Sequence, residues 1–214
     1  MNTLILSIIG SFIALDKYAF GEFGISQPLI SGTIIGALYG DIGTGIFLGA
    51  IFQLVCLGGL PIGTEIPPDA QTAGIVGCGS YFILQIANAP GHALLIATLF
   101  AFLFSILGGA TDIVLRHFHD RLSLRFQRDE KRLYTYHFVG LLTSFLRTFL
   151  IFLTVFIIAS LITLPSYFPH LSRQLFMIIG ISMGLANASY LFIKKSTIVY
   201  TIVGGLCGLA LLVF

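Results

Sequence analysis

Carboxylates set in apolar sequence are the side chains of this chain best suited to chemistry. The first 110 residues contain a single base, Lys17, and five acids, which are Asp16, Glu22, Asp41, Glu65 and Asp69. A carboxylate inside a bilayer is costly unless it is paired, protonated or faces a watery cavity. Because one base cannot neutralise five acids, some of them are expected to line an aqueous pathway, bind a polar ligand or lie at the membrane surface.

The densest polar signal lies between residues 60 and 70. Pro67 and Pro68 prevent a regular helix there, so backbone amides and carbonyls are free beside Glu65 and Asp69. Carboxylates and amides hydrogen-bond well to hydroxyl groups, and Gln27 and Gln53 add further donors and acceptors. Such a pocket favours a neutral polyol over an anion. A metal ion, a proton or purely structural contacts between helices are the alternatives.

Two of the acids are expected to be structural. Glu22 lies close to Gly21 and Gly24, as in an ordinary surface loop, and Asp41 follows Gly40 in a predicted turn. The residues alone thus direct attention to Glu65 and Asp69, with Gln27 and Gln53 as companions.

The elements that must position these residues are membrane helices. The chain is 57% hydrophobic and only 9% charged, whereas soluble domains carry about 25% charged residues. Since a crossing takes about 20 apolar residues, we predict one all-α, polytopic membrane domain over residues 1–214 with about six to seven segments, some of them broken or re-entrant. The candidate segments are 1–15, 28–60, 72–88, 92–115, 136–164, 174–193 and 196–214. The stretch 28–60 is too long for one span and is interrupted by glycines and Asp41, so a pair of shorter segments is expected.

Basic residues predict the orientation. Six of the eleven fall between Arg116 and Arg132, which indicates a cytoplasmic loop at about 116–135. Arg147, inside an apolar segment, is expected either to pair with an acid or to extend toward the cytoplasmic surface.

Several functional classes lack support in the sequence. There is no Walker A motif, no G-x-G-x-x-G before a helix and no H-E-x-x-H. The three cysteines have no paired spacing that would predict a zinc site. We therefore expect a chain that is not catalytic by itself, has no cofactor or metal, and binds no nucleic acid.

An ordered set of short motifs over about 60 residues resembles the IIC subunit of the mannose/sorbose family of the phosphotransferase system. These motifs are Leu15-Asp16, Gln27-Pro28-Leu29-Ile30, Gly40-Asp41-x-x-Thr44-Gly45, Gly49, Gln53, Leu57-Gly58, Ile62-Gly63 and Pro68-Asp69-Ala70. The resemblance continues more loosely through Phe145-Leu146-Arg147 and the carboxyl-terminal segments.

The resemblance implies a multi-pass protein of the bacterial inner membrane that pairs with a IID subunit and passes a hexose-type sugar inward. Cytoplasmic IIA and IIB proteins would supply the phosphoryl group, and the IIC chain would not itself be phosphorylated. An elevator-type transporter with a mobile core and a scaffold arm, as a homo-oligomer within a larger complex, is expected. The positions matching sugar contacts are Asp16, Gln27, Gln53, Glu65 and Asp69, with Asp69 best supported by its motif.

The chain departs from the family pattern in ways that bear on the sugar. Lys17 stands where an acid is common, Gln53 stands where Glu is common, and the region Phe20 to Ser26 is longer than usual. The carboxyl end is shorter than in many members, which bears on contacts to the IID partner. An ion-coupled or cation transporter and a membrane scaffold without a solute path are the competing hypotheses.

Overall fold

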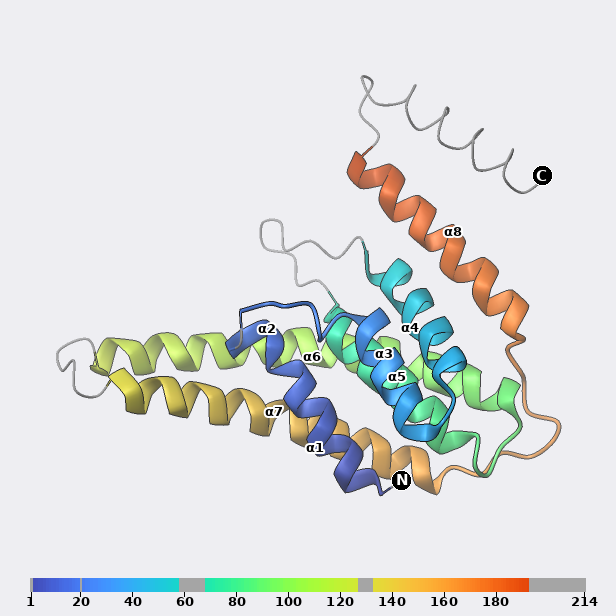
Figure 1. Ribbon diagram of the computed structural model, residues 1–214, viewed down its shortest axis with the longest axis horizontal. Coiled ribbons are helices and arrows are strands. Elements are labelled where there is room, and N and C mark those ends of the chain that lie inside the picture. Colours follow the sequence, from blue (N-terminus) through green and yellow to red (C-terminus); the bar gives the residue numbers. More distant parts are fainter. Residues whose placement is uncertain (1, 20, 58–67, 127–132, 193–214) are drawn as a thin grey trace.

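Every regular element in the described part of the chain is an α-helix. The structure is a computed structural model that describes residues 2–19, 21–57, 68–126 and 133–192 (Figure 1). The helices are α1 (Thr3–Ala14), α2 (Asp16–Ala19), α3 (Pro28–Tyr39), α4 (Ile42–Cys56), α5 (Ala70–Leu84), α6 (Pro90–Phe126), α7 (Leu133–Leu161) and α8 (Arg173–Phe192). This confirms the predicted all-α class. By length and composition, α6 and α7 qualify as membrane-spanning helices within this part of the chain, and the number of crossings stays a prediction.

The stretch predicted to be a pair of shorter segments is the hairpin of α3 and α4. Pro28 opens α3, a favourable place for proline because the first helical amides have no partner within the helix. Gly40 ends α3 with a φ of 79°, in the left-handed region that glycine adopts readily. Asp41 then caps α4 by accepting a hydrogen bond from the Thr44 amide at 2.9 Å. Asp41 is thus a turn and capping residue, as the sequence indicated.

Glycines let the two helices of this hairpin approach closely. A Cβ atom added at Gly36 would lie 2.7 Å from the Asp41 carbonyl oxygen and 2.7 Å from the Cα atom of Gly45, and both are backbone atoms. Such small-residue contacts are the usual means of tight helix packing in membranes.

Substitution of Gly36 by Ala should therefore lower the free energy of unfolding by about 1–3 kcal/mol, the usual cost of overpacking. The matched control is Gly140→Ala in α7, because no atom lies within 4 Å of the added Cβ there. Thermal unfolding of both variants in detergent measures the difference. Equal unfolding midpoints for the two variants would contradict this prediction, because the hairpin would then tolerate a larger distance between α3 and α4.

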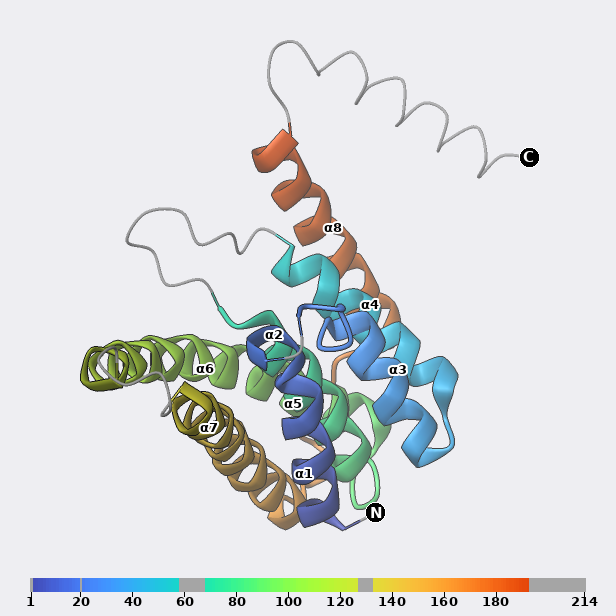
Figure 2. The ribbon, with the colours of Figure 1, turned by 60° about the vertical axis from the view of Figure 1, so that its left-hand side comes forward.

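Helix α5 lies at the centre of the fold. Thirteen of its fifteen residues are buried, and it contacts α1, α3, α4, α6 and α7, so that other helices enclose it in Figure 2. A helix held on so many sides is a rigid support, and its N-cap residue Asp69 and first-turn residue Gln71 lie in the region described below.

Helices α6 and α7 form a long antiparallel arm that extends beyond the other helices (Figures 1 and 2). The loop predicted at about 116–135 is wrong in most of its length, since α6 continues to Phe126 and α7 begins at Leu133. An ion pair between Asp112 and Arg116, one helical turn apart at 2.9 Å, supports the helix at the point where the predicted segment 92–115 ends. Neither glycine nor proline interrupts residues 111–126. The cytoplasmic side of this end stays a prediction.

Candidate functional site

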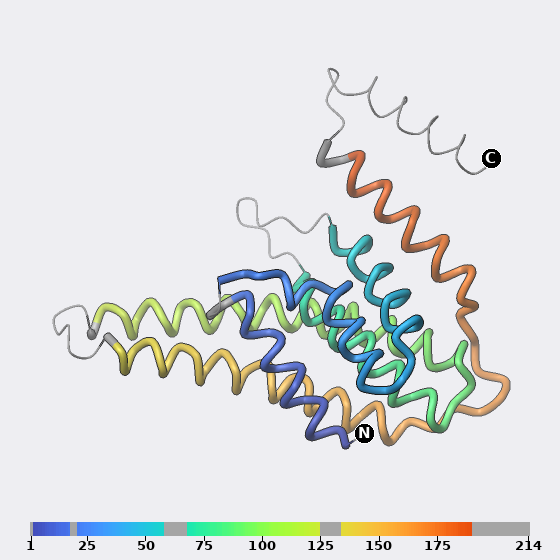
Figure 3. The backbone as a smooth tube through the Cα atoms, viewed as in Figure 1, coloured from blue at the N-terminus to red at the C-terminus, as the bar shows by residue number. Residues whose placement is uncertain are grey.

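The candidate site lies where the end of α2 and the starts of α3 and α5 come together. The chain turns after α2, crosses through residues 21–27 to the start of α3, and passes the start of α5 (Figure 3). The Asp69 amide, just before α5, donates to the Ser105 carbonyl on α6 at 3.0 Å. Ser105 lies about 22 Å along α6 from its start, at a rise of about 1.5 Å per residue. The hydrocarbon core of a bilayer is about 30 Å thick, so the convergence lies well inside the depth that α6 could span.

Asp16 organises the segment that links α2 to α3. Its side chain is buried and accepts three hydrogen bonds, from the Phe23 amide at 3.0 Å, the Ser26 amide at 3.2 Å and the Ser26 hydroxyl at 3.3 Å. The segment needs this anchor because it contains residues in the left-handed region, including Glu22 at a φ of 55°. Asp16 therefore fixes the wall of the site as well as facing it.

Asp69 forms the charged contact of the site. Its Oδ1 lies 3.3 Å from Lys17 Nζ, and its Oδ2 accepts a hydrogen bond from the Thr72 hydroxyl at 2.6 Å. The Asp69 side chain is only 3% exposed, whereas that of Lys17 is 35% exposed. A buried carboxylate so paired is neutralised without losing its remaining lone pairs, which can still accept hydrogen bonds.

A cavity of about 190 Å³, called the inner cavity below, lies between these elements and opens to the protein surface, since Glu22 and Gln27 in its lining are exposed. Its lining residues are Asp16, Lys17, Glu22, Gly24, Ser26, Gln27 and Gln71. The volume equals that of roughly six waters of the liquid, which is more than a single ion or water would fill. Carboxylates, an amine, a hydroxyl and amides thus surround a space for a small polar molecule.

The structure brings together part of the predicted set. Asp16 and Gln27 line the inner cavity, and Asp69 contacts it through Lys17. Gln53 lies on α4, outside the cavity lining, and its Oε1 is buried without a hydrogen-bond partner among the described residues. Glu65 lies outside the described residues.

Other lining residues were missed from the sequence. Glu22 belongs to a loop, as expected, but that loop borders the cavity. Lys17 and Gln71 were not selected, although the only base of the first 110 residues and an amide two positions after Asp69 were available signals. Gln71 Nε2 donates to Ser26 Oγ at 2.6 Å and so joins α5 to the linking segment.

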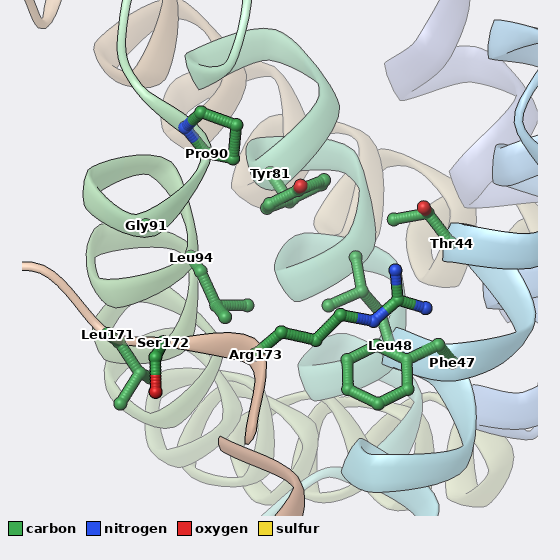
Figure 4. A pocket seen from close by; sticks show the side chains of 10 residues that line it. All are labelled: Thr44, Phe47, Leu48, Tyr81, Pro90, Gly91, Leu94, Leu171, Ser172 and Arg173. Atoms are coloured by element: carbon green, nitrogen blue, oxygen red, sulfur yellow. The ribbon is translucent and has the colours of Figure 1, made fainter. Parts of the chain in front are cut away.

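A second cavity, of about 240 Å³, lies near the amino-terminal ends of α4, α6 and α8 (Figure 4). Its lining is mostly apolar, and the guanidinium of Arg173 lies 4.2 Å from the centroid of the Phe47 ring. None of the predicted binding residues lines it. It also lacks the carboxylates and side-chain amides found in the inner cavity.

Arg147 pairs with an acid, which decides between the two expectations for it. Its Nη1 lies 3.0 Å from Asp112 Oδ1, and the two side chains are 9% and 11% exposed. Arg116 contacts the other oxygen of Asp112 at 2.9 Å. Asp112 is therefore a buried link between α6 and α7.

The fold is that of a known helical membrane protein. A solved structure described as "Structure of membrane protein" superposes on this chain with a TM-score of 0.72 and 19% sequence identity, over 96% of this chain and 85% of the other. The family described as "PTS system sorbose-specific iic component" matches residues 1–212, so the chain belongs to that phosphotransferase-system family of membrane proteins.

Individual relatives match shorter stretches. The "PTS system mannose-specific EIIC component" of Escherichia coli (strain K12) is 36% identical over 73 residues, which cover 34% of this chain and 27% of the relative. The "PTS system sorbose-specific EIIC component" of Klebsiella pneumoniae is 37% identical over 73 residues, with the same coverage. The "Putative N-acetylgalactosamine permease IIC component 2" of Escherichia coli (strain K12) is 30% identical over 117 residues, or 51% of this chain and 86% of that one. The chain thus spans about a quarter of the length of the mannose and sorbose relatives.

Proposed function

We propose that this chain is the sugar-translocation subunit, IIC, of a mannose-family phosphotransferase system. It binds a hexose-type sugar and moves it inward for phosphorylation by partner IIA and IIB proteins, and it is not catalytic by itself. The inner cavity is the observation that carries the proposal, because it gathers carboxylates and amides inside an otherwise apolar helical fold. Family membership and the sugars named in the relatives' descriptions support it.

The charges of the site suit a neutral substrate. Lys17 neutralises Asp69, and Asp16 accepts three hydrogen bonds from backbone and hydroxyl donors, so a sugar can bind without bringing a counter-charge. Together with Glu22, the site retains an excess of negative charge. Like charges repel, so a sugar phosphate should be excluded. That exclusion would favour inward movement, since the phosphorylated product does not rebind.

The proposed assembly follows from the family. The chain would be a multi-pass protein of the bacterial inner membrane, a homo-oligomer that functions with a IID subunit. The proposed sugar contacts are Asp16, Gln27, Gln53, Glu65 and Asp69, with Glu65 proposed from the sequence alone.

Ligand-induced stabilisation of the purified full chain tests this function. Cys78 is fully buried, so a thiol-reactive dye reports unfolding in detergent. D-mannose, L-sorbose, D-fructose and N-acetyl-D-galactosamine are added separately. A ligand at about a hundred times its Kd stabilises by about 2.7 kcal/mol, so at least one sugar should raise the midpoint by several degrees, and D-mannose 6-phosphate should not.

Two other outcomes would contradict the proposal. A rise with a divalent cation but with none of the four sugars would indicate a cation carrier. No rise with any sugar or cation would favour a scaffold subunit without a solute path.

A further inference from the structure

We propose that Gln71 is a further specificity-determining residue of the inner cavity, whose side-chain oxygen accepts a hydrogen bond from one hydroxyl group of the bound sugar. This inference rests on the proposed function, and it goes beyond the residues that the sequence motifs select.

The orientation of the Gln71 amide follows from a directed chain of hydrogen bonds. An ionised Asp16 carboxylate can only accept, so the Ser26 hydroxyl, 3.3 Å away, donates its single proton to it. Ser26 Oγ then has only lone pairs for its other neighbour, and Gln71 must turn its NH₂ group toward it, at 2.6 Å. The carbonyl oxygen of Gln71 therefore faces away from Ser26. The amide orientation is fixed by its partners and not only by the assignment of its atoms.

The side-chain oxygen of Gln71 has no hydrogen-bond partner among the residues that the structure describes. Gln71 is 7% exposed, lines the inner cavity, and its Oε1 is buried with no hydrogen-bond partner in the described part of the chain. Buried polar atoms in folded proteins are almost always satisfied by protein, water or ligand. Gln71 lines the cavity while its Oε1 is shielded from a water-sized probe, so a ligand donor reaches this acceptor, and removes its desolvation cost, through a small movement of the lining side chains.

The chemistry of the acceptor defines what it recognises. A carbonyl oxygen accepts from a hydroxyl but gains nothing from a ring oxygen, an ether or a C–H group in the same place. A site built to bond a hydroxyl rejects the analogue that lacks it, because its own polar group is then left unpaired. Gln71 is therefore expected to discriminate one hydroxyl of the sugar from its deoxy counterpart.

Binding of deoxy sugars to paired variants tests the inference. Affinities of the full chain in detergent are measured for D-mannose and for the derivatives that each lack one hydroxyl. In the wild type, loss of one particular hydroxyl should weaken binding about tenfold, the value of one hydrogen bond in a buried site. Gln71→Met should weaken D-mannose binding by a similar factor and should abolish the additional loss for that one derivative only. Gln85→Met, at the other end of α5, is the matched control and should behave as the wild type.

A conservative variant guards against misfolding of Gln71→Met. Gln71→Asn keeps both the NH₂ donor that Ser26 Oγ requires and an oxygen acceptor, and it should keep discrimination against the same derivative. The inference is overturned if D-mannose binds the wild type but Gln71→Met discriminates against that derivative as strongly as the wild type does, or if Gln71→Asn binds D-mannose without that discrimination. Failure of the proposed function is distinct, because then neither D-mannose nor the other three sugars of the stabilisation test bind the wild type at all.

Discussion

Replacement of Arg147 by Met is expected to lower the free energy of unfolding by about 3–5 kcal/mol, the usual cost of removing one partner from a buried ion pair. The carboxylate of Asp112 would keep only Arg116, whose side chain is 65% exposed. An acid of low exposure in a segment apolar enough to cross a membrane would then lack its buried counter-charge. Because Arg147 and Asp112 join α7 to α6, the arm should loosen. Unfolding in detergent, followed by the thiol dye, measures the loss.

The control for this prediction is Arg116→Met, which removes a cation from the same carboxylate at an exposed position. Exposed ion pairs contribute only about 0–1 kcal/mol, so this variant should stay close to the wild type. Adding Asp112→Asn to Arg147→Met should recover part of the lost stability, since no uncompensated charge is then left in the arm. If Arg147→Met were no less stable than Arg116→Met, the buried pair would not hold the two helices together.

Substitution of Asp69 by Asn should weaken sugar binding by about tenfold to a hundredfold, in line with the value of about 1.5–3 kcal/mol for a hydrogen bond to a charged group. The amide that replaces the carboxylate would donate toward either Lys17 or Thr72, both of which donate to Asp69 in the wild type. Lys17 would then be displaced from the cavity wall. Affinity for D-mannose measures the effect, and the variant should still insert into membranes.

Asp41→Asn is the matched control for Asp69→Asn. Asp41 caps α4 away from the inner cavity, and Asn caps helices about as well as Asp. Sugar affinity should therefore be unchanged. If Asp69→Asn bound D-mannose with wild-type affinity, Asp69 would not be a sugar contact, whatever the affinity of Asp41→Asn.

The local features of the fold were predictable from the sequence. The Gly40-Asp41 pair marked the turn between α3 and α4, because glycine adopts the left-handed conformation and Asp caps the helix that follows. The end of α6 was misplaced by the charges near Arg116. Charged residues are compatible with an exposed helix, and the clustering of bases indicates the side of the membrane more than it indicates a loop.

The site itself was only partly predictable, for a physical reason. Asp16 and Gln27 could be selected because a polar side chain in apolar sequence needs an explanation wherever it lies. The contact of Lys17 with Asp69 spans 52 residues, and that of Gln71 with Ser26 spans 45 residues. Such pairs depend on how α2, α3 and α5 pack, which no local pattern encodes.

The most direct test of sugar binding in the inner cavity is a structure of the protein determined with saturating D-mannose, or with whichever of the four sugars stabilises it. The sugar is expected in the inner cavity, between α2, the segment 21–27 and the start of α5, with Gln27 and Gln71 in hydrogen-bonding contact. A sugar bound instead in the cavity beside Phe47 and Arg173, with the inner cavity unchanged, would contradict it.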